Sequence, residues 1–153
     1  GYVPVLEFDD GSRLTEGPAI LQYVADKAGA RDLIPPAGSF ERAQLQSWLN
    51  FVSSELHKGF SPLFNPRLGE DAKAIFRAKL LERIGYLDGH LTGREYIMGA
   101  DFTLPDAYAF TVLGWSRPLK LDLSGYKNVE AYRARILKRP AVQAAMKAEG
   151  LIK

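Results

Sequence analysis

Cysteine is absent from the 153 residues of this chain. Its absence excludes disulfides, thiolate metal sites and a cysteine nucleophile within the chain, and it agrees with a reducing compartment. Long hydrophobic runs are also missing, because no stretch approaches the ~20 apolar residues that span a bilayer. The first residues lack the pattern of a signal peptide. We therefore predict a cytoplasmic protein with no membrane partner and no metal site.

Hydrophobic residues make up 46% of the chain, which suffices for a substantial core and excludes a wholly disordered segment. Charge is balanced overall but uneven along the chain. From Arg117 onward there are nine basic and three acidic residues, a net charge of +6, whereas the preceding part carries −4. Because these basic residues are not interleaved with aromatic ones, we interpret them as a solvated helix face and expect no nucleic-acid partner.

The first residues predict a short β-hairpin over residues 3–14. The apolar run from Val3 to Phe8 is strand-like, and the Asp-Gly pair within residues 9–12 is typical of a turn between two strands. Pro4 belongs at a strand edge or start, or in a cis peptide bond, because proline cannot donate to a strand ladder. A lone two-stranded hairpin is marginal in water, so we expect its sheet partners outside this chain or in another subunit.

A helix of about three turns is predicted over residues 19–28. Thr15 is a candidate cap, Glu16 complements the positive end of the helix, and Gly29 is a terminator. Free backbone N–H groups at the start of this helix favour an anion such as a carboxylate. The proline-rich segment 33–38 is predicted to be a linker.

A long helix is predicted to begin at Ser39, with an apolar stripe formed by Phe40, Ala43, Leu45, Trp48, Leu49, Val52 and Leu56. Spacings of i, i+4, i+7 and i+8 put four polar side chains on a neighbouring face: Asn50, Ser54, His57 and Lys58. Such a set suits a polar, anionic, peptide-like ligand, and the alternative is a solvated outer face. Gly59, Pro62 and the pair Asn65-Pro66 are expected to break or bend the helix.

A second long helix is predicted from about residue 70 to 91, with an apolar side formed by Ile75, Leu80, Ile84 and Leu87. After it, Thr103 and Asp106 have capping-box spacing. Asp106 is therefore interpreted as a helix cap rather than as a catalytic carboxylate. The helix that follows, to about Arg117, is apolar nearly all round and is expected to be central and buried.

Two shorter helices are predicted near the C-terminus. One spans residues 128–136 with Asn128 as its cap, and the other spans 141–148. Leu151 and Ile152 are expected to fold back onto the core.

Four segments together resemble the bacterial, beta-class glutathione S-transferases: residues 1–12, 14–20, 48–64 and 102–108. The resemblance implies an α+β fold, with a partial thioredoxin-like N-terminal domain of hairpin plus helix followed by an all-α helical bundle. The expected division is a thioredoxin-like remainder at 1–32, a linker at 33–38 and a helical domain at 39–153. The first β-α-β part of the thioredoxin-like domain is expected to lie outside this chain.

The resemblance also implies roles for residues of the N-terminal part. Val3 corresponds to the residue whose backbone pairs with the cysteinyl part of glutathione, and Pro4 to a cis-proline. Glu16 corresponds to the acidic residue that binds the γ-glutamyl amine. Gly17 stands where many members have serine, so that only its backbone N–H is left for the γ-glutamyl carboxylate.

On the long helix, Asn50, Ser54 and Lys58 resemble residues that reach glutathione, partly from the neighbouring subunit of a homodimer. His57 resembles the histidine near the sulfur, which contributes to catalysis as a hydrogen-bond donor or base.

The function implied is conjugation of the glutathione thiolate to small apolar electrophiles, in detoxification, with glutathione as co-substrate and no metal. Phe60, Phe64, Tyr108 and Trp115 are candidates for an apolar substrate wall, and the alternative for them is core packing. The family's sulfur-contacting residue belongs to the part expected outside this chain. The alternative function is therefore a non-catalytic binding or interaction domain. Glutathione-dependent redox chemistry is disfavoured because it would normally use a cysteine.

Overall fold

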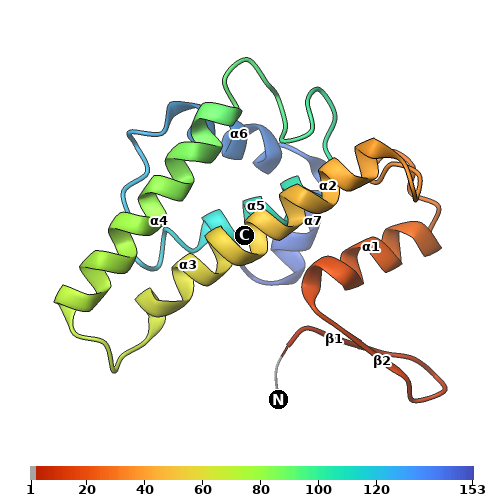
Figure 1. Cartoon of the computed structure of the whole chain (residues 1–153), viewed down its shortest axis with the longest axis horizontal. Helices are drawn as coiled ribbons and strands as arrows, with labels where there is room; N and C mark the ends of the chain where they lie inside the picture. Colours follow the sequence, from red (N-terminus) through yellow and green to blue (C-terminus); the bar gives the residue numbers. More distant parts are fainter. Residues whose placement is uncertain (1–2) are drawn as a thin grey trace.

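A computed structural model describes residues 3–153, and Gly1 and Tyr2 of the first resembling segment lie outside the described residues. The chain starts with a small sheet and continues as helices, which confirms the α+β class (Figure 1). The sheet consists of β1 (Val5–Glu7) and β2 (Arg13–Thr15). The helices are α1 (Gly17–Lys27), α2 (Phe40–Phe51), η1 (Val52–His57), α3 (Lys58–Phe60), η2 (Ser61–Phe64), α4 (Glu70–His90), α5 (Leu104–Gly114), α6 (Lys127–Leu137) and α7 (Pro140–Ala148).

The predicted hairpin is confirmed. Its strands are antiparallel, with Val5 opposite Thr15 and Leu6 opposite Leu14. The turn is closed by the Asp10 carboxylate, which accepts from the Ser12 N–H at 2.9 Å and from the Ser12 hydroxyl at 2.6 Å. Thr15 is the end of β2 and does not cap α1, so that prediction is wrong. The capping position is Glu16, whose side chain makes no capping hydrogen bond.

The long helix predicted from Ser39 is continuous from α2 to η2, and its colour runs from orange to yellow in Figure 1. The Ser39 hydroxyl accepts from the Arg42 N–H at 3.1 Å, as expected of a cap. Gly59 does not break the helix. A side chain there would lie 3.0 Å from Leu80, so the glycine instead lets α4 pack closely. The helix ends only at Asn65, after the tight turn η2.

The middle of this helix is a π-helical segment, η1, with the wider i→i+5 hydrogen bonding. Sequence periodicity did not predict it. Most of the apolar stripe is buried, namely Leu45, Leu49, Val52 and Leu56. Phe40 is 73% exposed and Ala43 is also exposed, so the stripe was predicted one turn too long at its N-terminal end.

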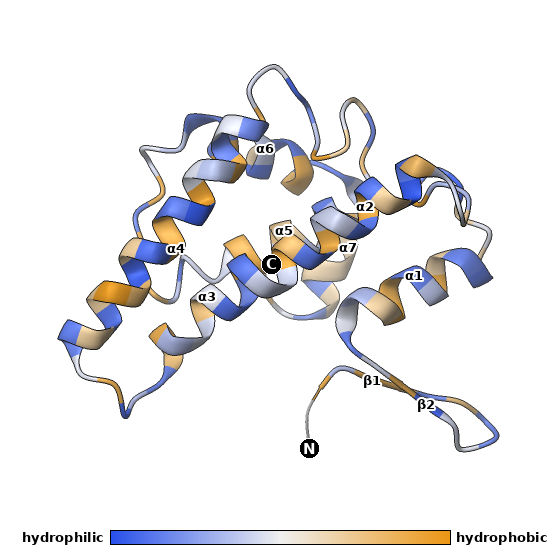
Figure 2. Cartoon of the chain, viewed as in Figure 1, coloured by the Kyte–Doolittle hydropathy of each residue, from blue (hydrophilic) through white to orange (hydrophobic). Residues whose placement is uncertain are grey.

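Helix α5 packs against α2 and η1 and carries a largely hydrophobic sequence, as its colouring in Figure 2 shows. Its buried residues include Ala109, Val112 and Leu113, which confirms the predicted central helix. Helix α4 contributes Leu80, Ile84 and Leu87 to the same core. Ile75 is 72% exposed, because the N-terminal turns of α4 extend beyond the core, and its predicted burial is wrong.

Asp106 lies at the centre of a buried hydrogen-bond network. One carboxylate oxygen accepts from the Thr103 N–H and hydroxyl at 2.8 and 2.9 Å. The other accepts from the Ile97 N–H at 2.8 Å and the Tyr132 hydroxyl at 3.0 Å. Burial raises the pKa of Asp106, while these hydrogen bonds act in the opposite direction. The carboxylate thus caps α5 and ties its first turn to the loop before it and to α6.

Helix α6 is capped by a residue of another helix. Asp88 of α4 accepts from the Val129 N–H at 2.8 Å. The predicted cap, Asn128, lies inside α6 and donates to the Asp88 carbonyl at 3.1 Å instead. At the C-terminus Leu151 is 60% exposed, so its predicted packing onto the core is also wrong.

A second cluster joins the N-terminal part to the helical part. Ala25 of α1 and Ile34 pack with Leu45, Leu49 and Leu104. Segment 33–38, predicted as a linker, therefore contributes a side chain to the core, since Ile34 is 1% exposed. The domain limits at 1–32, 33–38 and 39–153 stay a prediction.

None of the helices within residues 3–153 has the length and apolar character needed to cross a membrane.

Replacing Asp106 with alanine is expected to lower the free energy of unfolding by about 3 kcal/mol or more, because several buried donors lose their acceptor at once. Urea denaturation measures the change. The matched control is Asp101→Ala, which removes an exposed carboxylate five residues away. If the two variants unfold at the same urea concentration, the Asp106 network does not stabilise the fold.

Candidate functional site

The candidate site begins at a corner between the hairpin and α1. The Val3–Pro4 peptide bond is cis, as the resemblance implied. A Cβ atom at Gly17 would lie 3.7 Å from Pro4 Cγ, so the first residue of α1 faces the proline ring. Between them in sequence, Glu16 has a φ of 70°, in the left-handed region that a residue with a side chain rarely adopts. An exposed, strained residue at the start of a helix is a candidate for function.

The first turn of α1 has one free donor among the described residues. The N–H groups of Ala19 and Ile20 both bond to the Glu16 carbonyl at 3.0 Å, and Pro18 has no N–H. Gly17 therefore presents the remaining N–H at the positive end of the helix dipole, where an anion is favoured.

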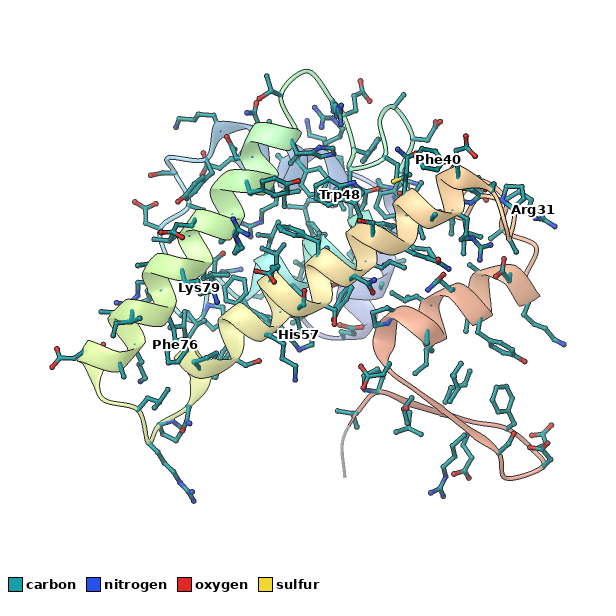
Figure 3. All side chains as sticks on the ribbon, in the orientation of Figure 1. Arg31, Phe40, Trp48, His57, Phe76 and Lys79 are labelled. Atoms are coloured by element: carbon teal, nitrogen blue, oxygen red, sulfur yellow. The ribbon has the colours of Figure 1, made fainter. Side chains whose placement is uncertain are left out.

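His57 lies across from this corner, at the end of η1, and Figure 3 shows it on the side of the long helix that faces the hairpin. Its Nδ1 is 2.7 Å from the Tyr108 hydroxyl of α5. The imidazole also meets the Trp115 ring edge-on, with 4.8 Å between ring centroids. Three elements, η1, α5 and the turn after α5, thus fix the histidine.

Charges from both sides of the corner act on His57. Burial lowers its pKa below the ordinary value of 6.5, the Lys58 ammonium lowers it further, and the Glu16 carboxylate opposes both effects. Burial also raises the pKa of Tyr108, a hydrogen bond with the Ser53 side chain opposes that rise, and the charge of Glu16 adds to it. Glu16 therefore lies close enough to both side chains to influence their protonation, which links the hairpin–α1 corner to the long helix. At pH 7 the imidazole is neutral.

Burial distinguishes His57 from the other three polar residues that were predicted to share one face of the long helix. Asn50, Ser54 and Lys58 are exposed, whereas His57 is half-buried and turned toward Tyr108. The Ser54 hydroxyl donates a hydrogen bond to the carboxylate of its neighbour Glu55 at 3.4 Å.

The predicted aromatic wall divides into two kinds of residue. Phe60 is fully buried and belongs to the core. Phe64 is 48% exposed and meets Trp115 with 5.9 Å between centroids. Tyr108 and Trp115 are half-buried beside His57. An apolar surface suited to a hydrophobic ligand is therefore formed by Phe64, Tyr108 and Trp115.

The bond between His57 and Tyr108 is the feature that sequence reasoning missed. The two residues are 51 positions apart, and no local motif connects them. Tyr108 lies two residues after Asp106 in a recognisable capping motif, which was the only signal that its position would be well defined. Within residues 3–153, no group of three or more acidic or histidine side chains could hold a metal ion.

Comparisons with known proteins agree with this geometry. Residues 51–140 match the family described as glutathione S-transferase, C-terminal domain. The chain is 46% identical over 151 residues to glutathione S-transferase GstA of Escherichia coli O157:H7, a match that covers 99% of this chain and 75% of that protein.

Two solved structures have the same fold. A beta-class glutathione S-transferase of Sphingomonas chungbukensis superposes with a TM-score of 0.92 and 44% identity, over 99% of this chain and 75% of that one. A sphingomonad glutathione S-transferase in complex with glutathione gives a TM-score of 0.91 and 43% identity, with the same coverage of both chains. This chain spans about three quarters of the length of these relatives.

The charges around His57 predict two opposite shifts of its pKa. Lys58→Gln should raise the pKa of His57, and Glu16→Gln should lower it, because each variant removes one of the two charges that act on the imidazole. NMR titration of the histidine ring protons measures both. His90 serves as an internal control, since its pKa is lowered chiefly by burial and neither Lys58 nor Glu16 influences it. Shifts of the same sign in the two variants would contradict this arrangement.

The lowered pKa also has a consequence for stability. The unfolded chain binds a proton at His57 more readily than the folded one does, so stability rises with pH across this window. The contribution of neutral His57 is complete above about pH 6.5 and is lost as the pH falls through the lower pKa of the folded state.

Proposed function

This chain belongs to the glutathione S-transferase family, and we propose that it binds glutathione at the corner between Pro4, Glu16 and Gly17 and conjugates its thiolate to small apolar electrophiles. The observation that carries the proposal is the contact of His57 with Tyr108 at 2.7 Å, beside the rings of Trp115 and Phe64, together with the free Gly17 N–H at the start of α1.

The γ-glutamyl end of glutathione carries one carboxylate and one ammonium group. The free Gly17 N–H donates to the carboxylate, and the Glu16 side chain pairs with the ammonium. The exposed backbone of Val3, which lies outside β1, offers an N–H and a carbonyl to the cysteinyl peptide. Because Gly17 has no hydroxyl, the carboxylate depends on backbone donation more than it would with serine at this position.

Three exposed residues of the long helix, Asn50, Ser54 and Lys58, complete the proposed glutathione-binding site. Lys58 supplies a positive charge next to His57 for the second carboxylate of glutathione, and Asn50 and Ser54 offer further hydrogen bonds. In a homodimer, these residues reach glutathione partly from the neighbouring subunit.

His57 contributes near the sulfur. The neutral imidazole offers a hydrogen bond to the thiolate, which lowers the pKa of the glutathione thiol and so raises the fraction present as nucleophile near pH 7. The thiol proton passes to solvent. The thiolate then forms a carbon–sulfur bond with the electrophile as the leaving group departs, while Phe64, Tyr108 and Trp115 hold the apolar part of the substrate.

A homodimer in the cytoplasm is part of the proposal. Helices α2 and α4 carry an aromatic cluster in which the Trp48 ring lies edge-on to Phe51 at 5.3 Å between centroids and is stacked with Tyr86 at 6.1 Å. Tyr86 is 55% exposed. Aromatic residues gathered on a surface in this way are typical of an interface. A cysteine-free chain that uses a thiol co-substrate also suits a reducing compartment.

If this aromatic cluster forms the dimer contact, Tyr86→Lys should shift the sedimentation coefficient from that of a dimer to that of a monomer, because it places like charges at a hydrophobic contact. Ile75→Lys is the control, since Ile75 is exposed on α4 outside the cluster. A monomeric wild type, or a Tyr86→Lys variant that stays dimeric, would contradict the contact.

The transferase proposal is tested by conjugation of glutathione to a chloronitrobenzene, followed by absorbance. The assay compares this chain with a version that carries, at its N-terminus, the leading segment of the Escherichia coli relative. A lack of activity in the extended protein rejects the transferase function. A glutathione-dependent rise in melting temperature without turnover in either protein indicates the alternative, a binding domain.

The proposed glutathione-binding site is tested by Glu16→Gln, which keeps the size of the side chain and removes the charge that pairs with the ammonium group. We expect glutathione to bind about tenfold more weakly, the effect of losing one charge-assisted hydrogen bond. Isothermal titration calorimetry measures the affinity. Glu149→Gln, at an exposed position after α7, is the control. Equal affinities in the two variants would place the ammonium group elsewhere.

A further inference from the structure

The proposed function leaves open which group donates and which accepts in the hydrogen bond between His57 and Tyr108. At neutral pH both groups are uncharged, because burial lowers the pKa of His57 and raises the pKa of Tyr108. Only one proton can lie between Nδ1 and the phenolic oxygen at 2.7 Å. Either the phenol donates to Nδ1, or Nδ1–H donates to the phenol.

The donor and acceptor capacities of the two groups decide between these arrangements. The phenol proton needs an acceptor, and Nδ1 is the acceptor that the structure places beside it. If Nδ1–H donated instead, the phenol proton would have to go to the hydroxyl of Ser53, the other hydrogen-bonding side chain beside Tyr108. That hydroxyl is a weaker acceptor than a neutral imidazole nitrogen, and it can itself donate to the phenolic oxygen. Donation from Tyr108 to Nδ1 therefore makes the better use of both groups. The remaining ring proton is then on Nε2.

The surroundings hold this arrangement firmly. Trp115 meets the imidazole edge-on at 4.8 Å and the Tyr108 ring does so at 5.8 Å. Tyr108 itself is placed by α5, whose first turn is fixed by the Asp106 network two residues earlier. Among the described residues Nε2 has no hydrogen-bond partner, so its proton is available to a ligand.

We propose that Tyr108 is a positioning residue, whose hydroxyl donates to Nδ1 of His57 and thereby holds the imidazole as the Nε2–H tautomer that offers a hydrogen bond to the glutathione sulfur. The role of Nε2–H toward sulfur rests on the proposed function, whereas the tautomer is a property of the protein alone. In the other tautomer Nε2 would be an acceptor, which would repel a thiolate rather than stabilise it.

The tautomer is tested first without glutathione. The nitrogen-15 shifts of the imidazole distinguish protonated from unprotonated ring nitrogens, and His57→Gln assigns the signals. We expect an unprotonated Nδ1 in the wild type and a mixture of tautomers in Tyr108→Phe. Tyr126→Phe is the matched control, because it removes another half-buried tyrosine hydroxyl, bonded to the Leu81 carbonyl at 3.0 Å far along the chain from His57. A protonated Nδ1 in the wild type overturns the proposal.

The consequence for catalysis is tested by a double-mutant cycle in the N-terminally extended protein. Tyr108→Phe should lower kcat about fivefold with little change in the KM for glutathione, the size expected for one lost hydrogen bond in the transition state. In a His57→Gln background the same substitution should have almost no further effect, since Tyr108 acts through the histidine. An undiminished fivefold loss in that background overturns the positioning role. Absence of all activity with the expected tautomer intact would reject the transferase function and leave the Tyr108–His57 assignment standing.

Discussion

The geometry of the site depends on the hydrogen bonds of one side chain, the guanidinium of Arg42. It bonds to both carboxylate oxygens of Asp26 on α1, at 3.0 and 2.6 Å, and to the Pro35 carbonyl at 2.8 Å. Arg42 is 6% exposed, so the pair is shielded from water on one side. A bidentate pair of this kind fixes orientation as well as distance. Together with the apolar contacts of Ala25 and Ile34, it fixes the C-terminal turn of α1 against the helical part, and the helix carries its first residues from that anchored end.

The second half of the site is placed by helices that the buried carboxylate of Asp106 fastens together. Because Asp106 binds donors from α6 and from the loop before α5, the first turn of α5 cannot shift without breaking several hydrogen bonds. The position of Tyr108 is fixed as well, because it lies two residues after Asp106 on the same helix. The long helix supplies His57 from a π-helical turn, a feature often found where a helix presents a functional side chain. Folding and chemistry are thus coupled through the same short segment, residues 103–108.

Local chemistry allowed much of this to be predicted from sequence. The Asp-Gly turn, the Ser39 cap, the Thr103–Asp106 capping motif and the period of α4 all depend on neighbouring residues, and each is present in the structure. The errors arose where distant residues decide. Asn128 is a residue type that often caps a helix, but Asp88 of another helix caps α6 instead. Gly59 is a residue type that often breaks a helix, but here a glycine is needed because Leu80 of α4 packs too closely for a side chain.

The candidate site shows the same division. The resemblance identified residues of the corner and of the long helix, and the structure brings Glu16 and His57 within electrostatic reach of each other. The half-buried position of His57 was not predictable, because it depends on how α5 packs against η1. Its partner Tyr108 was not predictable either, since a contact across 51 residues depends on how α5 packs on the long helix.

The left-handed backbone of Glu16 has a consequence for how a ligand would be received. A residue with a side chain held at a φ of 70° costs on the order of 1–3 kcal/mol of conformational free energy. The fold holds Glu16 in this conformation before any ligand binds, because β2 ends on one side of Glu16 and α1 begins on the other. The backbone at Glu16 is consequently fixed before binding, and a ligand that contacts it loses little affinity to the ordering of this part of the main chain.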